Sequence, residues 1–365
     1  MSTEVSQQSS SEPPAKKLDL FEKMLPLTVA ICMAIGILLS VFVPGLNTTL
    51  EAMKIGDTNI LIAICLFLMM YPALLNLQVS ELKKVVKHPL PIGITLVSNW
   101  LIAPLLHAVL AKLFLADYPQ LIVAVILLGA SPCTAMVLVW GSLAGANQEQ
   151  NFINTSLNTI TIIFLYAPVV KLLTGMQNIE LDWLSLILSV LIFIGLPLIV
   201  GVITRKTLIP AKGIDWFENK YRPIVGKIAI VALLFTLIVL FSMNGQTMID
   251  HPLELVLVSI PLLVLYPIIV AINIFMTKMF RFKYREAATA IIIGSSSHFE
   301  IAIATAISLY GVASQAALGT TMGLFWEVPI MLSLTYFLRY LRDKKFFGNG
   351  ESKKEYRAAP KDAIL

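Results

Sequence analysis

Charged side chains are scarce in this sequence, and this scarcity is the first constraint on what the protein can be. Asp, Glu, Lys and Arg together make up 13% of the 365 residues, while hydrophobic residues make up 57%. Soluble domains typically carry about twice that share of charge. A soluble fold could not bury so much apolar surface, so the composition predicts an integral membrane protein surrounded by lipid.

Cysteine is also scarce, and the common catalytic motifs are missing. The three cysteines, Cys32, Cys65 and Cys133, all lie in hydrophobic stretches, which argues against a disulfide framework. The sequence has no paired metal ligands, no nucleophile elbow and no phosphate loop. We therefore expect a protein that is not an enzyme and that uses no cofactor and no resident metal.

The net charge of +5 does not indicate a nucleic-acid partner, because the basic residues sit in short loops and at the chain ends instead of on one face. Three loops are basic, with Lys83, Lys84 and Lys87; Arg205, Lys206, Lys212, Lys220 and Arg222; and Lys278, Arg281, Lys283 and Arg285. The alternate loops have almost no Lys or Arg, so the positive-inside rule predicts that both termini are cytoplasmic. The expected location is the plasma membrane, with a cell inner membrane or a vacuolar membrane as alternatives.

Ten hydrophobic stretches are long enough to cross a bilayer, which takes roughly 20 apolar residues per helix. They cover residues 25–45, 59–77, 89–114, 118–145, 149–175, 183–205, 222–244, 252–276, 286–310 and 314–343. The predicted fold class is therefore an all-α membrane protein with ten transmembrane helices. Residues 1–20 are rich in Ser, Glu, Pro and Lys and predict a disordered cytoplasmic tail, and residues 344–365 predict a second cytoplasmic tail.

Two of these stretches, 118–145 and 286–310, are interrupted by small polar residues at matching positions of two halves. The first break reads Gly129-Ala130-Ser131-Pro132-Cys133-Thr134-Ala135, and the second reads Gly294-Ser295-Ser296-Ser297-His298-Phe299-Glu300. Paired breaks indicate the central site of a transporter, because unwound helix ends expose backbone dipoles where lipid cannot reach. Five stretches in each half predict two inverted repeats, 21–175 and 176–343, whose broken helices cross near the midplane.

Cys133 and Glu300 are the residues that such a crossing would bring to one cavity. A carboxylate inside a membrane span costs about 2.5–3.5 kcal/mol on insertion scales, so we expect Glu300 to exchange protons; the alternative is a neutral acid bonded to a neighbouring helix. Cys133 follows Pro132, which removes a backbone donor, and its thiol offers soft-ligand chemistry. The alternative is that Cys133 is a small buried apolar side chain.

The other polar residues near the breaks have two interpretations each. Glu327 is either a second proton site or an anchor for the second break, and His298 either titrates near neutral pH or acts as a neutral hydrogen-bond donor. Six further side chains are candidates either for binding a hydroxylated solute or for holding helices together: Ser131, Thr134, Asn99, Asn154, Asn158 and Ser297. We expect His107 to be a packed polar residue.

The interrupted segments resemble a known family. The segment Gly129-Ala130-Ser131-Pro132-Cys133-Thr134-Ala135-Met136-Val137, followed by Val139-Trp140, is similar to the fourth-helix signature of arsenite-efflux permeases of the arsenical-resistance type 3 family. Phe299-Glu300 and Glu327-Val328-Pro329-Ile330-Met331-Leu332 are similar to two further motifs of that family. Met69-Met70-Tyr71-Pro72 and Asn99-Trp100 also fit, so the resemblance covers nearly all ten stretches.

The resemblance implies the fold of the bile acid/sodium symporter superfamily, in which the first, second, sixth and seventh helices form a panel beside a core where the fourth and ninth cross. It implies that Cys133 and Glu300 carry transport, and that the protein exports trivalent arsenite, sometimes antimonite, in exchange for protons. The expected partners are thus arsenous acid, protons and membrane lipid, and the expected mechanism is alternating access.

The chain departs from the family pattern at two places. It has Ser297-His298 where the family commonly has Asn-Phe, and Asn158-Thr159 where the family commonly has Asn-Asp. These departures concern the coupling stoichiometry and the solute carried. The alternative function is a sodium-coupled importer of an organic anion, as in the wider superfamily.

Overall fold

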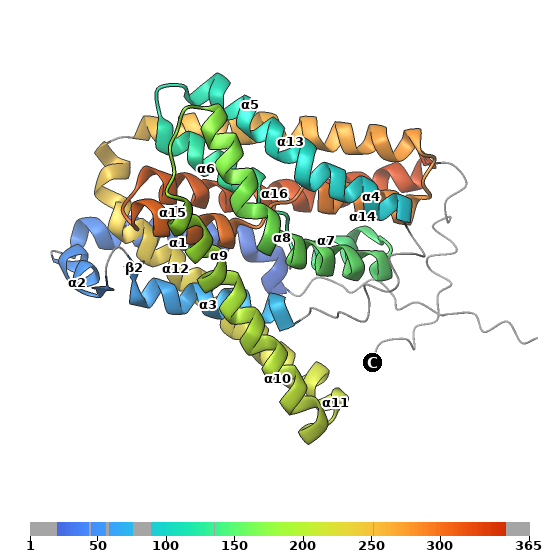
Figure 1. Ribbon diagram of the computed structural model, residues 1–365, viewed down its shortest axis with the longest axis horizontal. Helices are drawn as coiled ribbons and strands as arrows, with labels where there is room; N and C mark the ends of the chain where they lie inside the picture. The colour runs from blue at the N-terminus through green and yellow to red at the C-terminus, as the bar shows by residue number, and fades with distance from the viewer. Residues whose placement is uncertain are drawn as a thin grey trace, which may run out of the picture.

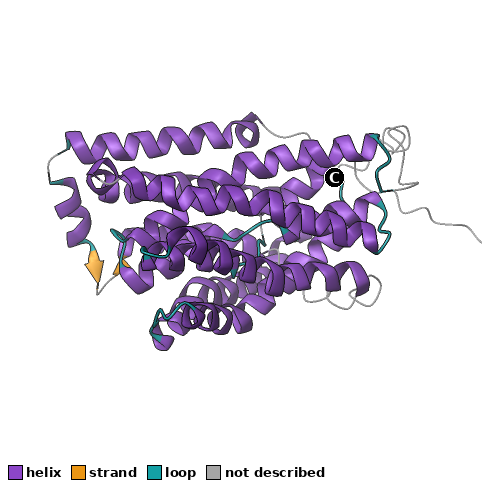
Figure 2. Ribbon diagram, turned by 90° about the horizontal axis from the view of Figure 1, so that it is seen from above, coloured by secondary structure: helices purple, strands orange, loops and turns teal. Residues whose placement is uncertain are grey.

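The described part of the chain is almost entirely helical (Figure 1; Figure 2). The computed structural model describes residues 20–43, 45–55, 58–75, 89–134, 136–250 and 252–347. The predicted N-terminal tail up to residue 19, the basic residues Lys83, Lys84 and Lys87, and the predicted C-terminal tail beyond residue 347 lie outside these ranges. The strands described are two residues long each, β1 (Lys54–Ile55) and β2 (Thr58–Asn59), and they pair antiparallel.

The described helices account for nearly all of the regular structure. In chain order they are α1 (Leu20–Phe42), α2 (Leu46–Ala52), α3 (Ile60–Leu75), α4 (Pro89–Val97), η2 (Ser98–Ile102), α5 (Ala103–Leu115), α6 (Pro119–Gly129), α7 (Met136–Ala144), α8 (Gln148–Met176), α9 (Trp183–Val190), η3 (Leu191–Gly195), α10 (Leu196–Lys212), α11 (Ile214–Trp216), η4 (Phe217–Tyr221), α12 (Arg222–Asp250), α13 (Pro252–Met279), α14 (Tyr284–Gly294), α15 (Phe299–Tyr310) and α16 (Gln315–Asp343). The η segments are π-helical turns within longer helical runs, so each run continues through them.

The helical runs match the predicted stretches, and the two interrupted stretches are divided. The stretch 118–145 forms α6 and α7, and the stretch 286–310 forms α14 and α15. Six continuous runs are long and apolar enough to cross a membrane: Pro89–Leu115, Gln148–Met176, Trp183–Lys212, Ile214–Met243, Pro252–Met279 and Gln315–Asp343. The all-α membrane fold is thereby confirmed, while the count of ten crossings stays a prediction.

Polar caps fix where several helices begin. The side chain of Asn147 accepts a hydrogen bond from the backbone N–H of Gln150 at the start of α8, and Ser314 caps α16 in the same manner. Asp182 precedes α9 and accepts bonds from the hydroxyl and the backbone N–H of Ser185 at 2.6 and 2.7 Å. These two donors favour the ionised form and hold the pKa of the Asp182 carboxyl below its usual value.

The helices form two groups, a panel and a core. The panel consists of α1, α3, α10 and α12, which pack on one another and occupy the lower part of Figure 1. The core contains α4 to α8 and α13 to α16, with α5 against α6 and α13, and α16 against α6 and α15. The run that begins with α9 joins the two groups, because α9 packs on α15 and α10 packs on α3. This is the arrangement that the family resemblance implies.

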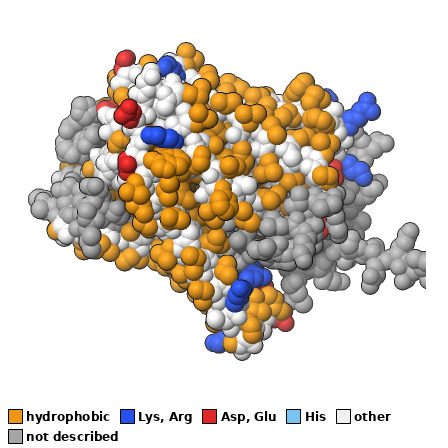
Figure 3. Space-filling model, in the orientation of Figure 1, with side chains coloured by type: hydrophobic (Ala, Val, Ile, Leu, Met, Phe, Trp, Pro, Cys, Tyr) orange, Lys and Arg blue, Asp and Glu red, His pale blue; other side chains and the backbone are white. Residues whose placement is uncertain are grey.

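Large apolar side chains cover the outside of the molecule. Leu113, Phe164, Val231 and Phe275 each expose about two thirds of their surface, at 69%, 68%, 65% and 66%. Figure 3 shows hydrophobic side chains spread across the middle of one face, with Lys and Arg toward its margins. A continuous apolar surface of this extent suits a bilayer and would be an aggregation hazard in water.

The close contact between α1 and α12 depends on the absence of a side chain at Gly36. A larger residue at this position therefore tests whether the contact stabilises the panel. A Cβ atom at Gly36 would lie 2.6 Å from the Cβ of Phe241 and 2.7 Å from the carbonyl oxygen of Ile238. We expect Gly36→Ala to lower the free energy of unfolding by about 1–3 kcal/mol, because the two backbones must move apart. The measurement is thermal unfolding of the purified protein in detergent.

Gly226→Ala is the matched control for this substitution. Gly226 lies in α12, the helix that Gly36 of α1 contacts, and a Cβ there would meet nothing within 4 Å. Alanine should therefore be neutral or slightly stabilising at that position. Equal stability of the parent and Gly36→Ala would show that close approach of α1 and α12 does not hold the panel together.

Candidate functional site

The two helix breaks meet backbone to backbone. Residues 130–134 after α6 and residues 295–298 after α14 are not helical, and Pro132 pairs with Ser297 as an antiparallel bridge. The backbone N–H of His298 donates to the carbonyl oxygen of Ser131 at 2.6 Å. Each break thus supplies hydrogen-bonding groups to the other, as a crossing within lipid requires, because no water is available there to do so.

Side chains from neighbouring helices satisfy further backbone groups of the breaks. Asn158 of α8 donates through Nδ2 to the carbonyl oxygen of Cys133 at 3.0 Å, and Asn99 of η2 donates to Oδ1 of Asn158 at 3.1 Å. Ser98 donates to the carbonyl oxygen of Gly294 at 2.9 Å. The hydroxyl of Ser131 donates back to the α6 carbonyls just before it. Asn99 and Asn158 therefore hold the crossing together in this structure, whereas the Ser131 hydroxyl bonds within its own helix.

A cavity on the panel side of the crossing contains Cys133 and Glu300 together; we call it the front cavity. Its lining is Cys133, Met136, Trp140, Leu233, Ser297, Phe299, Glu300, Leu324, Glu327 and Val328. Leu233 comes from α12, so the cavity lies between the panel and the core. Four of the sequence-predicted site residues, Cys133, Ser297, Glu300 and Glu327, meet there, although they come from both breaks and from α16.

Glu327 is held by three donors from the second break. The hydroxyl of Ser296 donates to Oε1 at 2.6 Å, the backbone N–H of Ser297 donates to Oε1 at 3.0 Å, and the Ser297 hydroxyl donates to Oε2 at 2.5 Å. The Glu327 side chain is 5% exposed. Three donors satisfy both oxygens of a carboxylate, so Glu327 ties α16 to the break that precedes α15.

Glu300 has a different environment from Glu327. Its Oε2 lies 2.8 Å from Nδ1 of His298, and its side chain is 14% exposed. The distance is that of an ion pair when the imidazole is protonated, although Nδ1 has no hydrogen bond of good geometry among the described residues. Glu300 is thus the more open of the two carboxylates in the front cavity.

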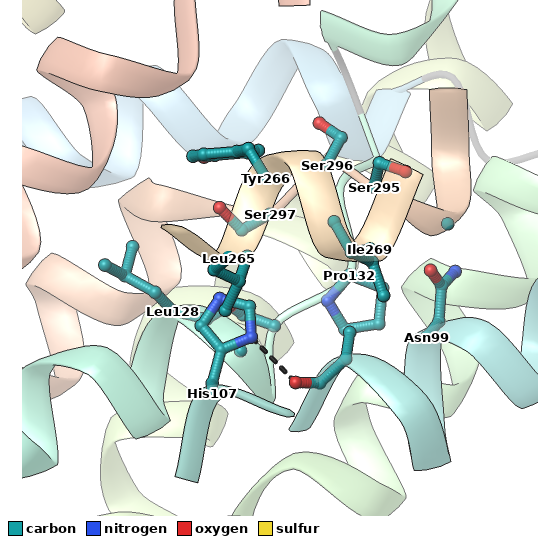
Figure 4. A pocket seen from close by; sticks show the side chains of 14 residues that line it. Asn99, His107, Leu128, Pro132, Leu265, Tyr266, Ile269, Ser295, Ser296 and Ser297 are labelled. Carbon is teal, nitrogen blue, oxygen red and sulfur yellow. Dashed lines mark hydrogen bonds between the residues drawn. The ribbon is translucent and has the colours of Figure 1, made fainter. Parts of the chain in front are cut away.

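A second cavity lies behind the crossing, between α5 and α13; we call it the rear cavity (Figure 4). His107 lines it, with Nδ1 2.7 Å from the carbonyl oxygen of Ala103 and the ring against Gly129, where a Cβ would lie 2.3 Å from the imidazole. The ring is buried, in agreement with the prediction of a packed polar residue. Ser297 lines both cavities, so one residue of the second break separates them.

Four candidates from the sequence, Thr134, Asn154, Asn158 and His298, line neither cavity, and one residue was missed. Thr134 and Asn154 line neither cavity, and their buried side-chain polar atoms have no partner among the described residues. Tyr266 of α13 was not predicted, yet its phenol lies beside Ser297 and Glu327 and lines the rear cavity. The available signal was a tyrosine immediately before the helix proline Pro267.

The front cavity combines a soft sulfur group with hard oxygen groups in an apolar frame. Within the described residues no cluster of three or more His, Cys, Asp or Glu side chains could hold a metal ion. A single thiol beside one open carboxylate suits a small, hydroxylated, thiol-seeking solute that binds and leaves. The apolar side chains of the lining exclude water from such a solute.

Comparison with known proteins places the chain in a transporter family. Residues 63–251 match the Sodium Bile acid symporter family. An uncharacterized transporter of Synechocystis sp. is 41% identical over 336 residues, which cover 87% of this chain and 88% of the relative. Two relatives called arsenical-resistance protein Acr3 are 33% identical (Alkaliphilus metalliredigens) and 30% identical (Corynebacterium glutamicum).

The Acr3 similarity extends over nearly the whole chain. It covers 87% of this chain and 92% of the Alkaliphilus protein, and 93% of this chain and 94% of the Corynebacterium protein. Both broken helices and both cavities lie within a match of that length. The chain is a multi-pass membrane transporter and belongs to the sodium/bile acid symporter family as an Acr3-type member.

Proposed function

We propose that this chain exports trivalent arsenite, with antimonite as a second cargo, in exchange for protons. The observation that carries the proposal is the front cavity, where the Cys133 thiol and the Glu300 carboxylate line one space between the panel and the core. The similarity to the two Acr3 proteins, whose name refers to arsenical resistance, supports arsenite as the cargo.

The chemistry of arsenous acid fits these two groups. The acid is neutral at physiological pH and carries three hydroxyl groups on arsenic. In the proposed binding step the S–H bond of Cys133 and one As–O bond break, while an S–As bond and one water molecule form, so no electron is transferred and no net proton is released. A carboxylate in the same cavity can take the thiol proton and return it to the departing hydroxide.

One sulfur contact keeps the cargo exchangeable. The other cysteines, Cys32 and Cys65, lie buried in α1 and α3 of the panel and line neither described cavity. A site with three thiols would hold arsenic far more tightly, whereas transport requires release on the far side. Reversal of the single S–As bond by water provides that release.

Glu327 and Glu300 have different proposed roles. Glu327 is occupied by Ser296 and Ser297 and serves as the anchor of the second break, which is one of its two predicted roles. Glu300 is open to the front cavity and is the proposed site where proton and cargo compete. Each proton that enters along the membrane potential supplies about 2.3 kcal/mol per 100 mV, which favours export of a neutral cargo.

Alternating access between the panel and the core is the proposed motion, with both termini cytoplasmic in a plasma membrane. The division into halves 21–175 and 176–343 is supported by matching final helices. Both α8 and α16 are 29 residues long, have a proline inside (Pro168 and Pro329) and begin at a side-chain cap. Opposite insertion of two such halves would bring their broken helices together at the centre.

Replacement of Cys133 tests the cargo site. We expect Cys133→Ala to reduce arsenite accumulation in everted vesicles by more than about tenfold, since loss of only ~1.4 kcal/mol of binding gives that factor. Cys65→Ala is the control, because Cys65 is buried beside Thr236 in the panel. Normal transport by Cys133→Ala would remove the thiol from the mechanism.

Replacement of Glu327 tests its role as an anchor. We expect Glu327→Gln to lower the free energy of unfolding by about 2 kcal/mol, because the bonds from Ser296 and Ser297 lose their charged acceptor. Glu254→Gln should cost less, since Glu254 accepts one described bond, from Gln315. If Glu327→Gln stays fully stable but transport loses its pH dependence, Glu327 is a proton site instead.

The coupling ion separates this proposal from the sodium-coupled importer. In vesicles with an imposed proton gradient and no sodium gradient, arsenite should accumulate against its own gradient, and a proton ionophore should abolish the accumulation. The opposite pattern, transport that follows sodium and ignores the ionophore, would favour the importer.

A further inference from the structure

An arm of the chain projects from the panel, far from both cavities. We call residues 199–228 the basic arm; they include most of α10, then α11, η4 and the start of α12. Figure 1 shows α10 running away from the other helices, with α11 at its far end. Pro197 and Gly201 are the buried residues of α10, and α11 has none. Most of α10 beyond Gly201 therefore faces the surroundings of the protein.

Hydrogen bonds hold the base of the arm against α3. The Tyr71 hydroxyl donates to Oγ1 of Thr204 at 2.8 Å and lies 2.8 Å from the hydroxyl oxygen of Tyr221. The guanidinium of Arg205 donates to the carbonyl oxygen of Leu75 at 3.2 Å. These contacts join α10 and η4 to the helix at the centre of the panel, so anything that binds the arm is attached to the panel.

The arm has an excess of positive charge. It contains six Lys or Arg side chains and two acidic ones, so its formal charge is +4. The acids are Asp215 and Glu218, and Glu218 is paired with Arg222 and, at 3.7 Å, with Arg205. The four lysines of the arm are exposed, and none has an ion pair among the described residues: Lys206, Lys212, Lys220 and Lys227.

The exposed side of the arm changes from apolar to basic toward its end. On α10, Ile199 and Ile203 are 58% and 56% exposed, and Lys206 follows on the same face of the helix. On the returning part, Ile224 is 57% exposed, and Lys220 lies four residues closer to the end of the arm. Isoleucine suits the hydrocarbon of a bilayer, whereas lysine extends its ammonium group to the headgroups. This order places the end of the arm at headgroup depth.

Trp216 and two lysines form a group at the end of the arm. The Nζ atom of Lys212 lies 4.5 Å from the centroid of the Trp216 ring. Lys220 follows Trp216 by four residues, which is about one turn of the helical run. The Trp216 ring also stacks on Tyr221, with 5.9 Å between centroids. Tryptophan and tyrosine are enriched where the membrane meets water, so this group suits the headgroup layer.

We propose that the basic arm binds the phosphate groups of anionic phospholipids through Lys212 and Lys220, with Trp216 as the interfacial anchor. Each lysine near an anionic membrane surface contributes about 1 kcal/mol of attraction. The exposed isoleucines contact the acyl chains of the same lipids, which a free phosphate ion does not have. This proposal requires a membrane protein and depends on neither the cargo nor the coupling ion of the proposed function.

The test measures lipid enrichment next to Trp216 in full-length protein in phosphatidylcholine nanodiscs. A small share of the lipid is either phosphatidylglycerol or phosphatidylcholine with a spin label near the headgroup, which quenches nearby tryptophan fluorescence. The quenching that disappears in Trp216→Phe reports the arm. We expect labelled phosphatidylglycerol to be enriched about fivefold or more over labelled phosphatidylcholine, the factor that ~1 kcal/mol gives. Equal quenching by the two lipids would overturn the proposal.

Charge at two lysines should decide this preference. The double variant Lys212→Gln with Lys220→Gln should lose it, whereas Lys212→Arg with Lys220→Arg should keep it, because arginine retains the charge. Lys112→Gln is the matched control, since Lys112 is also exposed and lies beside the 69% exposed Leu113, but is the single Lys or Arg of α5. A preference that survives in the glutamine double variant, or that Lys112→Gln reduces equally, would overturn the proposal.

Salt and inorganic phosphate separate a lipid site from a site for any anion. Sodium chloride should weaken the preference, because salt screens exposed charges. Inorganic phosphate at the same ionic strength should weaken it no further, since it has no acyl chains. A larger effect of phosphate than of chloride would indicate a free-phosphate site and overturn the lipid assignment. No arsenite is present in these measurements, so their result is independent of the proposed function.

Discussion

The contact between the two unwound segments is the constraint on which the rest of the molecule depends. Pro132 meets Ser297, and Ser131 accepts a bond from the backbone of His298. Unwound backbone is tolerated at membrane depth only where protein surrounds it, so every neighbouring helix must supply a partner or an apolar cover. Asn158 and Ser98 supply partners from α8 and η2, while the panel covers the open side.

The crossing also accounts for the unequal environments of the two intramembrane carboxylates. Glu327 projects from α16 and accepts hydrogen bonds from Ser296 and Ser297 of the second break. Glu300 lies one residue into α15 and faces the same cavity as Cys133, beside an imidazole. One glutamate is therefore fully hydrogen-bonded by the second break, while the other remains open to the front cavity.

Much of the fold followed from the sequence, while the roles of single polar residues did not. Composition and the two polar interruptions predicted broken helices within an all-α membrane protein, because apolar length and small-residue runs are local signals. The bond from Asn158 to the carbonyl of Cys133 depends on the packing of α8 against α7, which no local pattern encodes. Tyr266 was missed for the same reason, since its position beside Ser297 is set by how α13 crosses the break.

The contact between His298 and Glu300 could not be predicted from their spacing in the sequence. Residues two positions apart on a helix point away from each other. His298, however, precedes α15 with φ −106° and ψ 79°, outside helical geometry, so its side chain can turn back to Glu300. The sequence identified His298 and Glu300 as candidate residues. Only the non-helical backbone before α15 shows that their side chains come into contact.

The central claim is that one thiol, placed by the crossing, binds the cargo in the front cavity. X-ray absorption at the arsenic edge of the arsenite-loaded protein tests this most directly, because it counts the neighbours of arsenic by element. The account predicts one sulfur neighbour with oxygen in the remaining positions, and loss of the sulfur signal in Cys133→Ala. Arsenic with only oxygen neighbours, or with three sulfur neighbours, would contradict it.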